Sequence, residues 1–410
     1  MIRVFHVITS LGRGGAERQL VNLVRNTHRS KLEHIICFLR PPDTFAGEIR
    51  AAGHRVICLH LPSKWPWLMA PVKLLPVLRA HRPDIIQTWL FDADFSVRLS
   101  RWGAVKTIPV INTLHSIPYE PGVIKAAGLS PLKMAGLRRL DELTARWAKP
   151  LFVACSETVK ESARQRLGIP AARISIIYNS IDAATLRCSP EAPQLLRQEL
   201  RIPEDGFVFL SVGRLDPPKG HDCLLRAFQQ VAASLPDAYL VLVGDGPSAA
   251  SLRHLADELG VSERVRFAGQ RRDVGACLEM ADTFVFPSLF EGLPLAPIEA
   301  MMKGLPCIAS RIGPLLELIS DGETGVLVAP GSIDELATVM TELYHNRARR
   351  ELLGTRARQF ALSRFDSRVG LQAWEELYRK VAVGGHLRDT VWPPAGKVTR
   401  LAPPRHRARD

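Results

Sequence analysis

The order of apolar and polar residues along residues 1–182 predicts strands that alternate with helices. Short apolar runs are followed by stretches in which apolar residues recur at helical spacing, the first of them beginning at Ala16. Such alternation favours a parallel sheet with crossover helices, and therefore the α/β fold class. The predicted strands in this part of the chain are Arg3–Ile8, Glu33–Leu39, Arg55–His60, Ile85–Thr88, Pro109–Thr113 and Leu151–Ala154.

The second half repeats this alternation, and its strands end in loops that contain glycine. The predicted strands are Val208–Gly213, Tyr239–Val243, Arg264–Phe267 and Thr283–Pro287. The first is followed by Gly213–Gly220, the second by Gly244–Pro247 and the third by Gly269. An open α/β sheet binds ligands beyond the carboxyl ends of its strands, so these loops predict one binding site.

The segment from Glu291 to Glu299 is the most informative part of these loops. Pro294 suits a first helical position, which puts Glu291 in a loop and Glu299 near the second helical turn. The start of a helix offers unpaired N–H groups to phosphate, and an ionised carboxylate accepts hydrogen bonds from hydroxyl groups. The combination predicts a ligand that carries both groups, such as a phosphorylated sugar or a sugar nucleotide.

Basic residues in the neighbouring loops would supply the counter-charge for such a ligand. Arg214 and Lys219 stand in the loop that opens with Gly213, where glycine lets the backbone approach an anion. In the first half, Gly14 and Gly15 lie between the first strand and the first helix, where a Rossmann fold contacts phosphate. We interpret the two sets of loops as opposite sides of one cleft.

The composition agrees with an enzyme of two or three domains. The chain has 410 residues, of which 46% are hydrophobic, enough for sizeable cores. No apolar run reaches the roughly 18–20 residues that span a membrane, and the first residues predict a strand and not a signal peptide. The seven cysteines form no Cys-x-x-Cys pair, which favours a reducing cytoplasm over a disulfide or metal framework.

The basic residues are concentrated in the first half of the chain. Residues 1–200 contain 28 Lys and Arg against 15 Asp and Glu, whereas residues 201–410 contain 26 of each. A basic surface suits nucleic acid, anionic lipid or a phosphorylated acceptor. The chain has neither aromatic residues interleaved with the basic ones nor a known nucleic-acid module, so we expect no nucleic-acid partner. A basic face that only aids solubility is the remaining alternative.

Two segments favour an anionic membrane surface as a partner. Leu61–Met69 contains Trp65 and Trp67, and Lys125–Lys149 contains Trp147 among several Lys and Arg residues. Trp and cationic side chains favour the headgroup layer of a bilayer. We therefore expect peripheral docking on the cytoplasmic face of a membrane, unless the apolar residues of these segments pack inward on the first sheet.

Taken in order, the motifs of the chain resemble those of the family 4 glycosyltransferases, which are retaining enzymes with the GT-B fold. The resemblance covers nearly the whole sequence. Its pieces are Gly14-Gly15-Ala16-Glu17-Arg18, His115, Val153-Ala154-Cys155-Ser156-Glu157, Tyr178-Asn179-Ser180-Ile181-Asp182, Gly213-Arg214 with Lys219-Gly220, Gly244-Asp245-Gly246-Pro247, Glu291 with Glu299, and Gly322-Glu323-Thr324-Gly325. The Asn179-Ser180 pair departs from the Asn-Gly common in the family, which puts only a local turn in doubt.

The resemblance implies two Rossmann-like parallel-sheet domains that face a central cleft, with a C-terminal helix crossing back to the first domain. We expect an N-terminal acceptor-side domain at residues 1–182, an interdomain linker at 183–204 and a nucleotide-sugar-binding domain at 205–366. The crossover helix would occupy residues 367–383. Residues 384–410, rich in Pro and Arg, would form a disordered basic tail.

The resemblance also implies retaining transfer of a sugar from a nucleotide-sugar donor to a glycan or lipid-linked acceptor. Such transfer would serve the biosynthesis of cell-surface polysaccharide or glycolipid, without a cofactor or a metal. Arg214 and Lys219 would neutralise the leaving diphosphate in place of a divalent cation. Glu299 would accept hydrogen bonds from the ribose. The remaining contacts to the donor would come from Gly14, Gly15, Gly213, Gly244, Glu291, Gly292, Leu293 and Leu295.

His115 and the Asp92-Ala93-Asp94 triplet are each open to two interpretations. A single His at the end of a predicted strand is usually structural, but the resemblance puts His115 in the cleft near the donor sugar. The triplet is similar to the Asp-x-Asp metal motif of the other large glycosyltransferase fold. Because that fold lacks a second C-terminal sheet, we interpret the triplet as a surface or acceptor-side loop and expect no metal there.

Other functions are compatible with the same fold. A nucleotide-sugar 2-epimerase would release free nucleotide and an epimerised sugar without an acceptor, and a phosphorylase would need inorganic phosphate or a Lys-bound cofactor. A non-catalytic protein that binds a sugar nucleotide or an anionic surface would tolerate the loss of Glu291. The complete set of Arg214, Lys219, Glu291 and Glu299 favours an active transferase.

Overall fold

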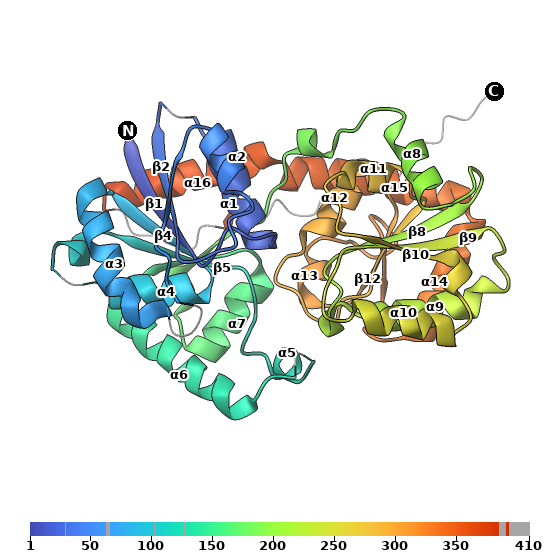
Figure 1. The fold of residues 1–410 in the computed structure, drawn as a ribbon, viewed down its shortest axis with the longest axis horizontal. Coiled ribbons are helices and arrows are strands. Elements are labelled where there is room, and N and C mark those ends of the chain that lie inside the picture. The colour runs from blue at the N-terminus through green and yellow to red at the C-terminus, as the bar shows by residue number, and fades with distance from the viewer. Residues whose placement is uncertain (29, 63–65, 102, 127, 385–390, 393–410) are drawn as a thin grey trace, which may run out of the picture.

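Two parallel β-sheets with helices packed against them make up the computed structural model of the protein (Figure 1). The structure describes all residues except 29, 63–65, 102, 127, 385–390 and 393–410. The first sheet lies in the half of the molecule that contains the N-terminus, and the second sheet lies in the other half (Figure 1).

The first sheet contains eight parallel strands in the order β14-β7-β6-β5-β4-β1-β2-β3. They are β1 (Ile2–Ile8), β2 (Leu32–Phe38), β3 (Arg55–Cys58), β4 (Ile85–Trp89), β5 (Val110–Leu114), β6 (Leu151–Ala154), β7 (Ile174–Ile177) and β14 (Val391–Trp392). From β1 the chain adds β2 and β3 on one side and then returns to add β4 on the other. The strand order therefore reverses between β1 and β4, and doubly wound sheets bind ligands at such a reversal.

Helices pack against both faces of the first sheet. The helices between the strands of this sheet are α1 (Gly15–Asn26), α2 (Ala46–Ala51), α3 (Pro66–His81), α4 (Phe91–Leu99), α5 (Pro121–Ala126), α6 (Pro131–Ala148) and α7 (Glu157–Leu167). Apolar residues of α1 and α2 share one core cluster with the sheet, and those of α3 and α4 share another. Helix α4 also contacts α6, so α3, α4 and α6 follow one another across one side of the sheet (Figure 1).

The second sheet has six parallel strands in the order β10-β9-β8-β11-β12-β13. They are β8 (Phe207–Val212), β9 (Ala238–Val243), β10 (Val265–Gly269), β11 (Thr283–Phe286), β12 (Cys307–Ser310) and β13 (Val326–Val328). The accompanying helices are α8 (Ala192–Glu199), α9 (His221–Ala232), α10 (Ala249–Glu258), α11 (Val274–Glu279), α12 (Leu295–Lys303), α13 (Gly313–Leu316), α14 (Ile333–His345) and α15 (Arg347–Phe365). Here the strand order reverses between β8 and β11.

The last long helix, α16 (Ser367–Ala382), crosses back and packs on the first sheet. Its Trp374 and Tyr378 are buried in the same core cluster as Trp89 of β4. The two passages of the chain between the sheets lie against each other, because Ile181 N donates to Phe365 O at 2.8 Å and Ser367 N donates to Ile181 O at 2.9 Å. The predicted fold class, with two Rossmann-like sheets and a returning helix, is confirmed.

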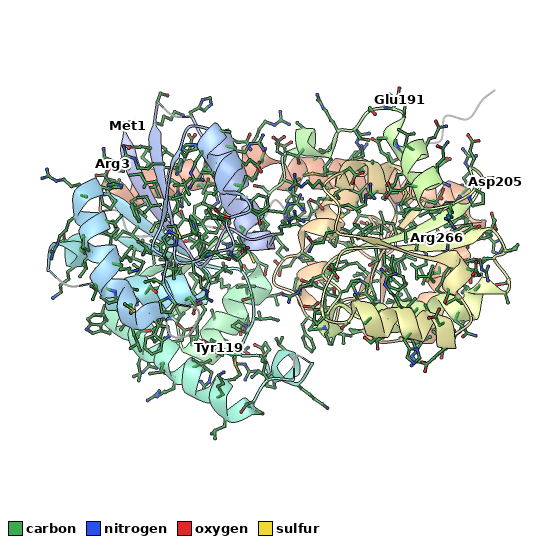
Figure 2. The ribbon with its side chains drawn as sticks, in the orientation of Figure 1. Met1, Arg3, Tyr119, Glu191, Asp205 and Arg266 are labelled. Atoms are coloured by element: carbon green, nitrogen blue, oxygen red, sulfur yellow. The ribbon has the colours of Figure 1, made fainter. Side chains whose placement is uncertain are left out.

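The segment predicted as a linker of little regular structure contains helix α8. Pro193 stands in the first turn of this helix, where its missing N–H costs nothing, and Leu196 is buried. Arg266 of β10 donates to Leu200 O at 2.6 Å and thereby ties the segment to the second sheet. Figure 2 shows Glu191, Asp205 and Arg266 together at the end of the molecule that the second sheet forms. The domain boundaries themselves stay a prediction.

The prediction that Asp92-Ala93-Asp94 forms a surface loop is wrong. The three residues lie in the first turn of α4, and only 6% of Asp94 is exposed. Asp94 accepts a hydrogen bond from Thr88 Oγ1, whereas Asp92 forms an ion pair with Arg40 at 2.9 Å. The two carboxylates thus serve different contacts, one in the core and one at the end of the strands.

Two strands were not predicted, and the position of Trp67 favours the alternative in which this side chain packs inward. Strand β7 was not predicted, because Ile174–Ile177 is a short, nearly continuous apolar run that periodicity does not separate from a buried turn. Val391–Trp392, within the predicted disordered tail, pairs with β7 as strand β14. The rest of the tail after 384 lies outside the described residues.

Trp67 is half-buried and packs edge-on against Phe95, with ring centroids 5.3 Å apart. Trp65 is outside the described part of the chain.

Candidate active site

Lys219 and Glu291 meet at the point where the strand order of the second sheet reverses. Lys219 follows β8 and Glu291 follows β11, and these strands are neighbours in the sheet. Lys219 Nζ lies 2.5 Å from Glu291 Oε1, with 22% of the lysine and 9% of the glutamate side chain exposed. Because water is largely excluded from both groups, their attraction is stronger than that of a surface pair. The pair is a preformed charged contact at the expected ligand position.

Arg214 stands at the rim of the same loop. Its side chain is 69% exposed, and its Nε lies 3.7 Å from Asp216 Oδ2. A guanidinium held so loosely is available to an incoming anion.

Glycine at position 244 allows the loops after β8 and β9 to pack closely against each other. A Cβ atom at Gly244 would lie 1.8 Å from the carbonyl oxygen of Gly213, and Gly244 has a φ of +138°. A side chain at Gly244 would therefore force the loops after β8 and β9 apart. Gly213 itself has open space at its Cβ position, which leaves its backbone accessible.

Glu299 lies in α12 and is 1% exposed. Arg18 Nη2 of α1 approaches its Oε1 to 2.7 Å from across the cleft. The approach is too poorly aligned to be a hydrogen bond, so Oε1 is a buried acceptor without a hydrogen-bond partner in the described structure. A buried carboxylate with acceptor capacity to spare beside this ion pair fits a ligand that brings hydroxyl groups.

The starts of two helices, one from each half of the chain, lie close together. Helix α1 begins at Gly15 behind Gly14, and α12 begins at Leu295. A Cβ atom at Gly15 would lie 3.9 Å from Leu295 Cδ1, so the two loops are in contact distance. Free N–H groups and partial positive charge at both helix starts favour a phosphate between them.

His115 follows β5 at the carboxyl edge of the first sheet and touches the loop that carries Glu291. A Cβ atom at Gly292 would lie 2.2 Å from the carbonyl oxygen of His115, so only glycine permits this approach. Burial lowers the pKa of His115 to about 4, which keeps the ring neutral near pH 7. Its Nε2 is buried and has no hydrogen-bond partner among the described residues.

Side chains of the first domain hold the backbone of this loop. Ser156 Oγ donates to Gly292 O at 2.8 Å, and Asn179 Nδ2 donates to Leu293 O at 2.8 Å. The loop after β11 is therefore fixed against the first domain at two successive carbonyl groups.

Glu317 makes a further contact between the domains that the sequence did not predict. Its carboxylate accepts hydrogen bonds from Glu157 N and Thr158 N, both at 2.9 Å, and from Thr158 Oγ1 at 2.8 Å. These groups form the start of α7, where a carboxylate is also favoured by the helix dipole. The Val153-to-Glu157 motif was one piece of the family resemblance, but nothing near it in the chain pointed to residue 317.

The structure thus brings most of the predicted site residues to the place where loops of the two sheets meet. An ion pair joins Lys219 with Glu291, the backbone of His115 lies against Gly292, and Leu295 lies near Gly15. Arg214 lies at the rim, and Arg18 is an unpredicted partner of Glu299. Among the residues that the structure describes, no group of three or more His, Cys, Asp or Glu side chains is arranged to hold a metal ion. Within the same residues, no helix is long and apolar enough to cross a membrane.

Comparisons with known proteins agree with this architecture. Residues 13–185 match the family described as Glycosyltransferase Family 4, and residues 194–360 match Glycosyl transferases group 1. A GDP-mannose-dependent alpha-(1-6)-phosphatidylinositol monomannoside mannosyltransferase of Mycobacterium tuberculosis is 26% identical over 383 residues, which cover 90% of this chain and 94% of that protein. The UDP-Gal:alpha-D-GlcNAc-diphosphoundecaprenol alpha-1,3-galactosyltransferase of Escherichia coli is 27% identical, covering 76% and 79% of the two chains.

Among solved structures, HepE of Anabaena in complex with UDP and glucose superposes with a TM-score of 0.81 at 24% identity, covering 93% of this chain and 100% of that one. Two Rossmann-like parallel sheets with a C-terminal helix that returns to the first of them define the GT-B fold. The two matched regions span most of the chain, which belongs to the family 4 glycosyltransferases.

Proposed function

We propose that this glycosyltransferase takes a sugar from a nucleoside-diphosphate sugar and transfers it, with retention and without a metal, to a glycan or lipid-linked acceptor. The shielded Lys219–Glu291 pair, beside the facing starts of α1 and α12, is the observation that carries the proposal. Relatives named for GDP-mannose and UDP-Gal support this donor class. Their named acceptors, a phosphatidylinositol glycolipid and a diphosphoundecaprenol-linked sugar, support a lipid-linked acceptor in polysaccharide or glycolipid synthesis.

In this proposal the diphosphate lies between the basic loop and the two helix starts. Lys219, already paired with Glu291, and the exposed Arg214 neutralise the charge that develops on the leaving phosphate. Glu299 accepts hydrogen bonds from the ribose, and Glu291 and the neutral His115 contact the donor sugar. The bond from the anomeric carbon to phosphate breaks as the acceptor oxygen attacks from the same face. The acceptor proton passes to the leaving phosphate oxygen.

The clamp is tested by removing one charge at a time. We expect Arg214→Ala and Lys219→Ala each to lower the transfer rate by roughly 10²–10³-fold, by analogy with the loss of one preorganised stabilising group. Arg253→Ala, a change of an exposed arginine that covers the Phe267 ring away from the clamp, is the matched control and should leave the rate unchanged. EDTA should have little effect on the wild-type enzyme. A strict requirement for Mg²⁺ or Mn²⁺ would contradict the metal-free mechanism.

The donor and the stereochemistry are decided by two measurements. Thermal stabilisation by UDP-glucose, UDP-galactose and GDP-mannose identifies the nucleotide, because ligand binding raises stability by mass action. Proton NMR of the first product then reports the new linkage. An α-linked donor should give an α-linked product, and an inverted linkage would overturn the retaining mechanism. An epimerised free sugar in the absence of any acceptor would support the epimerase alternative instead.

We also propose that the enzyme docks on an anionic cytoplasmic membrane surface through α3 and α6. These helices expose apolar side chains that lie among basic residues. The most exposed are Leu68 (61%), Met69 (47%) and Val72 (73%) on α3, and Leu132 (85%), Leu143 (47%) and Trp147 (51%) on α6. Several large apolar side chains exposed on each of two helices favour a partner surface. Each basic group near an anionic bilayer adds roughly 1 kcal/mol, and this attraction fades within about 8 Å at physiological salt.

Flotation with vesicles measures this docking. Wild-type protein should float with vesicles containing phosphatidylserine at low salt and less at high salt. Combined Leu132→Ser and Trp147→Ser should weaken flotation, whereas Leu195→Ser, an equally exposed change on α8 of the second domain, should not. Equal, negligible binding to anionic and neutral vesicles would refute membrane docking and leave the basic face to a soluble anionic acceptor.

A further inference from the structure

A row of buried aromatic side chains lies beneath His115. The His115 ring is stacked on the indole of Trp89, with ring centroids 5.2 Å apart and planes inclined by 14°. Trp89 is the last residue of β4 and is 1% exposed. Strand β4 pairs with β5, which ends one residue before His115. The indole is therefore the surface on which the His115 ring rests.

The indole is in turn held by a hydrogen bond to β1. Trp89 Nε1 donates to His6 Nδ1 at 3.2 Å, and His6 is completely buried. Trp374 of α16 also packs against Trp89, with ring centroids 6.2 Å apart. The orientation of the indole is thus set by two elements that do not contain His115.

The hydrogen bond from Trp89 fixes the direction of a chain that continues to β2. An indole nitrogen can only donate, so His6 Nδ1 must be the acceptor, and the proton of neutral His6 must sit on Nε2. His6 Nε2 lies 2.8 Å from His34 Nδ1. His34 Nδ1 is then an acceptor as well, and the proton of His34 also sits on Nε2. Burial lowers the pKa of both rings, that of His34 to about 3, so both are neutral near pH 7.

This arrangement has two energetic costs. His34 Nε2 ends the chain as a buried donor without a partner among the described residues, and leaving a buried polar group unsatisfied is unfavourable. Leu90, directly after Trp89, has a φ of +72° and a ψ of 157°, a backbone conformation that is strained outside glycine. Apolar packing alone would incur neither cost, and costs of this kind cluster at functional sites.

We infer that Trp89 is a positioning residue: the His6–His34 chain locks its indole, and the locked indole holds the His115 ring in one orientation at the end of β5. The inference rests on the proposed function in one respect, the contact between His115 and the donor sugar. A ring held this way meets the sugar without having to be ordered during the reaction. Trp89 acts on the reaction only through His115.

The hydrogen-bond chain is tested in the free protein by NMR of nitrogen-15-labelled histidine. From pH 6 to 8, His6 and His34 should both show a protonated Nε2 and an unprotonated Nδ1. In Trp89→Leu, the signals of His115 should shift and broaden, since the ring loses its stacking surface. Phe152→Leu is the matched control, because Phe152 is an equally buried ring on β6 of the same sheet. It should leave the His115 signals unchanged.

The second readout is turnover of a nucleotide sugar. The donor used is the one among UDP-glucose, UDP-galactose and GDP-mannose that stabilises the protein most. Trp89→Leu should lower kcat about 100-fold, the cost of loose placement, with the donor KM changed less than about threefold. Trp89→Phe keeps a ring but loses the N–H donor, and its kcat should be about tenfold higher than that of Trp89→Leu. Phe152→Leu should lower thermal stability but not kcat.

Several results would overturn the inference. A protonated Nδ1 on His6 in the wild-type protein would reverse the chain. Unchanged His115 signals in Trp89→Leu would show that the indole does not position the ring. Equal loss of kcat in Trp89→Leu and Phe152→Leu would mean that Trp89 contributes only core volume. If no nucleotide sugar binds the wild-type protein, the proposed donor class fails, while the NMR measurements still decide whether Trp89 holds His115.

Discussion

One added methyl group at Gly292 should open the cleft without unfolding either domain. A Cβ atom there would lie 2.2 Å from the carbonyl oxygen of His115 and 2.9 Å from its carbonyl carbon. Both neighbours are backbone atoms, so the loop after β11 must move away from the end of β5. Because non-bonded carbon atoms prefer separations of about 3.5–4.0 Å, the required shift is about 1 Å.

The shift would strain two further contacts between the domains. The hydrogen bonds from Ser156 to Gly292 O and from Asn179 to Leu293 O are both 2.8 Å long. Each contributes about 0.5–1.5 kcal/mol, so the closed arrangement would lose about 1–3 kcal/mol. A displacement of about 1 Å at a catalytic group can cost 100-fold in rate. We therefore expect Gly292→Ala to lower kcat/KM for the nucleotide sugar about 100-fold.

The assay combines turnover, small-angle X-ray scattering and thermal unfolding. Gly292→Ala should increase the radius of gyration and lower the melting temperature by no more than about 4 °C. Gly136→Ala is the matched control, since Gly136 is exposed on α6 and its Cβ position has open space. Alanine there should stabilise the helix by about 0.5–1 kcal/mol and leave turnover unchanged. Wild-type turnover and dimensions in Gly292→Ala would refute the argument that this contact sets the productive arrangement.

Three other substitutions test separate parts of the structure. Glu317→Ala removes hydrogen bonds that hold the second domain against the start of α7, and hydrogen bonds to a charged group contribute about 1.5–3 kcal/mol each. We expect this variant to bind UDP or GDP at least tenfold more weakly by calorimetry. Unchanged affinity would mean that this contact between the domains does not support nucleotide binding. Burial lowers the pKa of His221 from 6.5 to about 4, so the unfolded chain binds more protons between these values and stability falls as the pH falls. In His221→Asn, urea unfolding should therefore show a pH dependence shallower by up to about 1.4 kcal/mol per pH unit over that range, and an unaltered slope would contradict the assignment. Gly354→Ala, whose Cβ would lie 2.0 Å from Gly304 O, should destabilise the second domain by about 1–3 kcal/mol in thermal unfolding, and no loss would mean that α15 moves freely.

Most strands and helices could be predicted because their signal is local. The run from Ala238 to Val243 is apolar and the next residue is glycine, and this is enough to end strand β9. Helix α8 was missed because the prolines around it suggested a linker. Its stability comes from contacts that no local pattern contains, such as the bond from Arg266 to Leu200 O, 66 residues away.

The identity of many site residues could be predicted, but not their partners. Lys219 and Glu291 each stood out in a loop after a strand, yet their contact depends on β8 and β11 being neighbours. Asp94 resembled a metal ligand in sequence and is instead a buried acceptor for Thr88. Trp89 carried no signal at all, because its importance lies in side chains from β1, β2 and α16 that meet only in the folded sheet.

The return of α16 to the first sheet has a consequence for how the protein is made. Helix α16, which carries Trp374 and Tyr378, completes a core whose members outside this helix all precede residue 178, so that core remains open while about 200 residues emerge from the ribosome. At about 5–20 residues per second this delay lasts roughly 10–40 s. During that time the face of the sheet around Trp89 lacks its cover and is open to aggregation. The nascent chain is therefore expected to need a chaperone most during synthesis of its second domain, after strands β1–β7 have already left the ribosome.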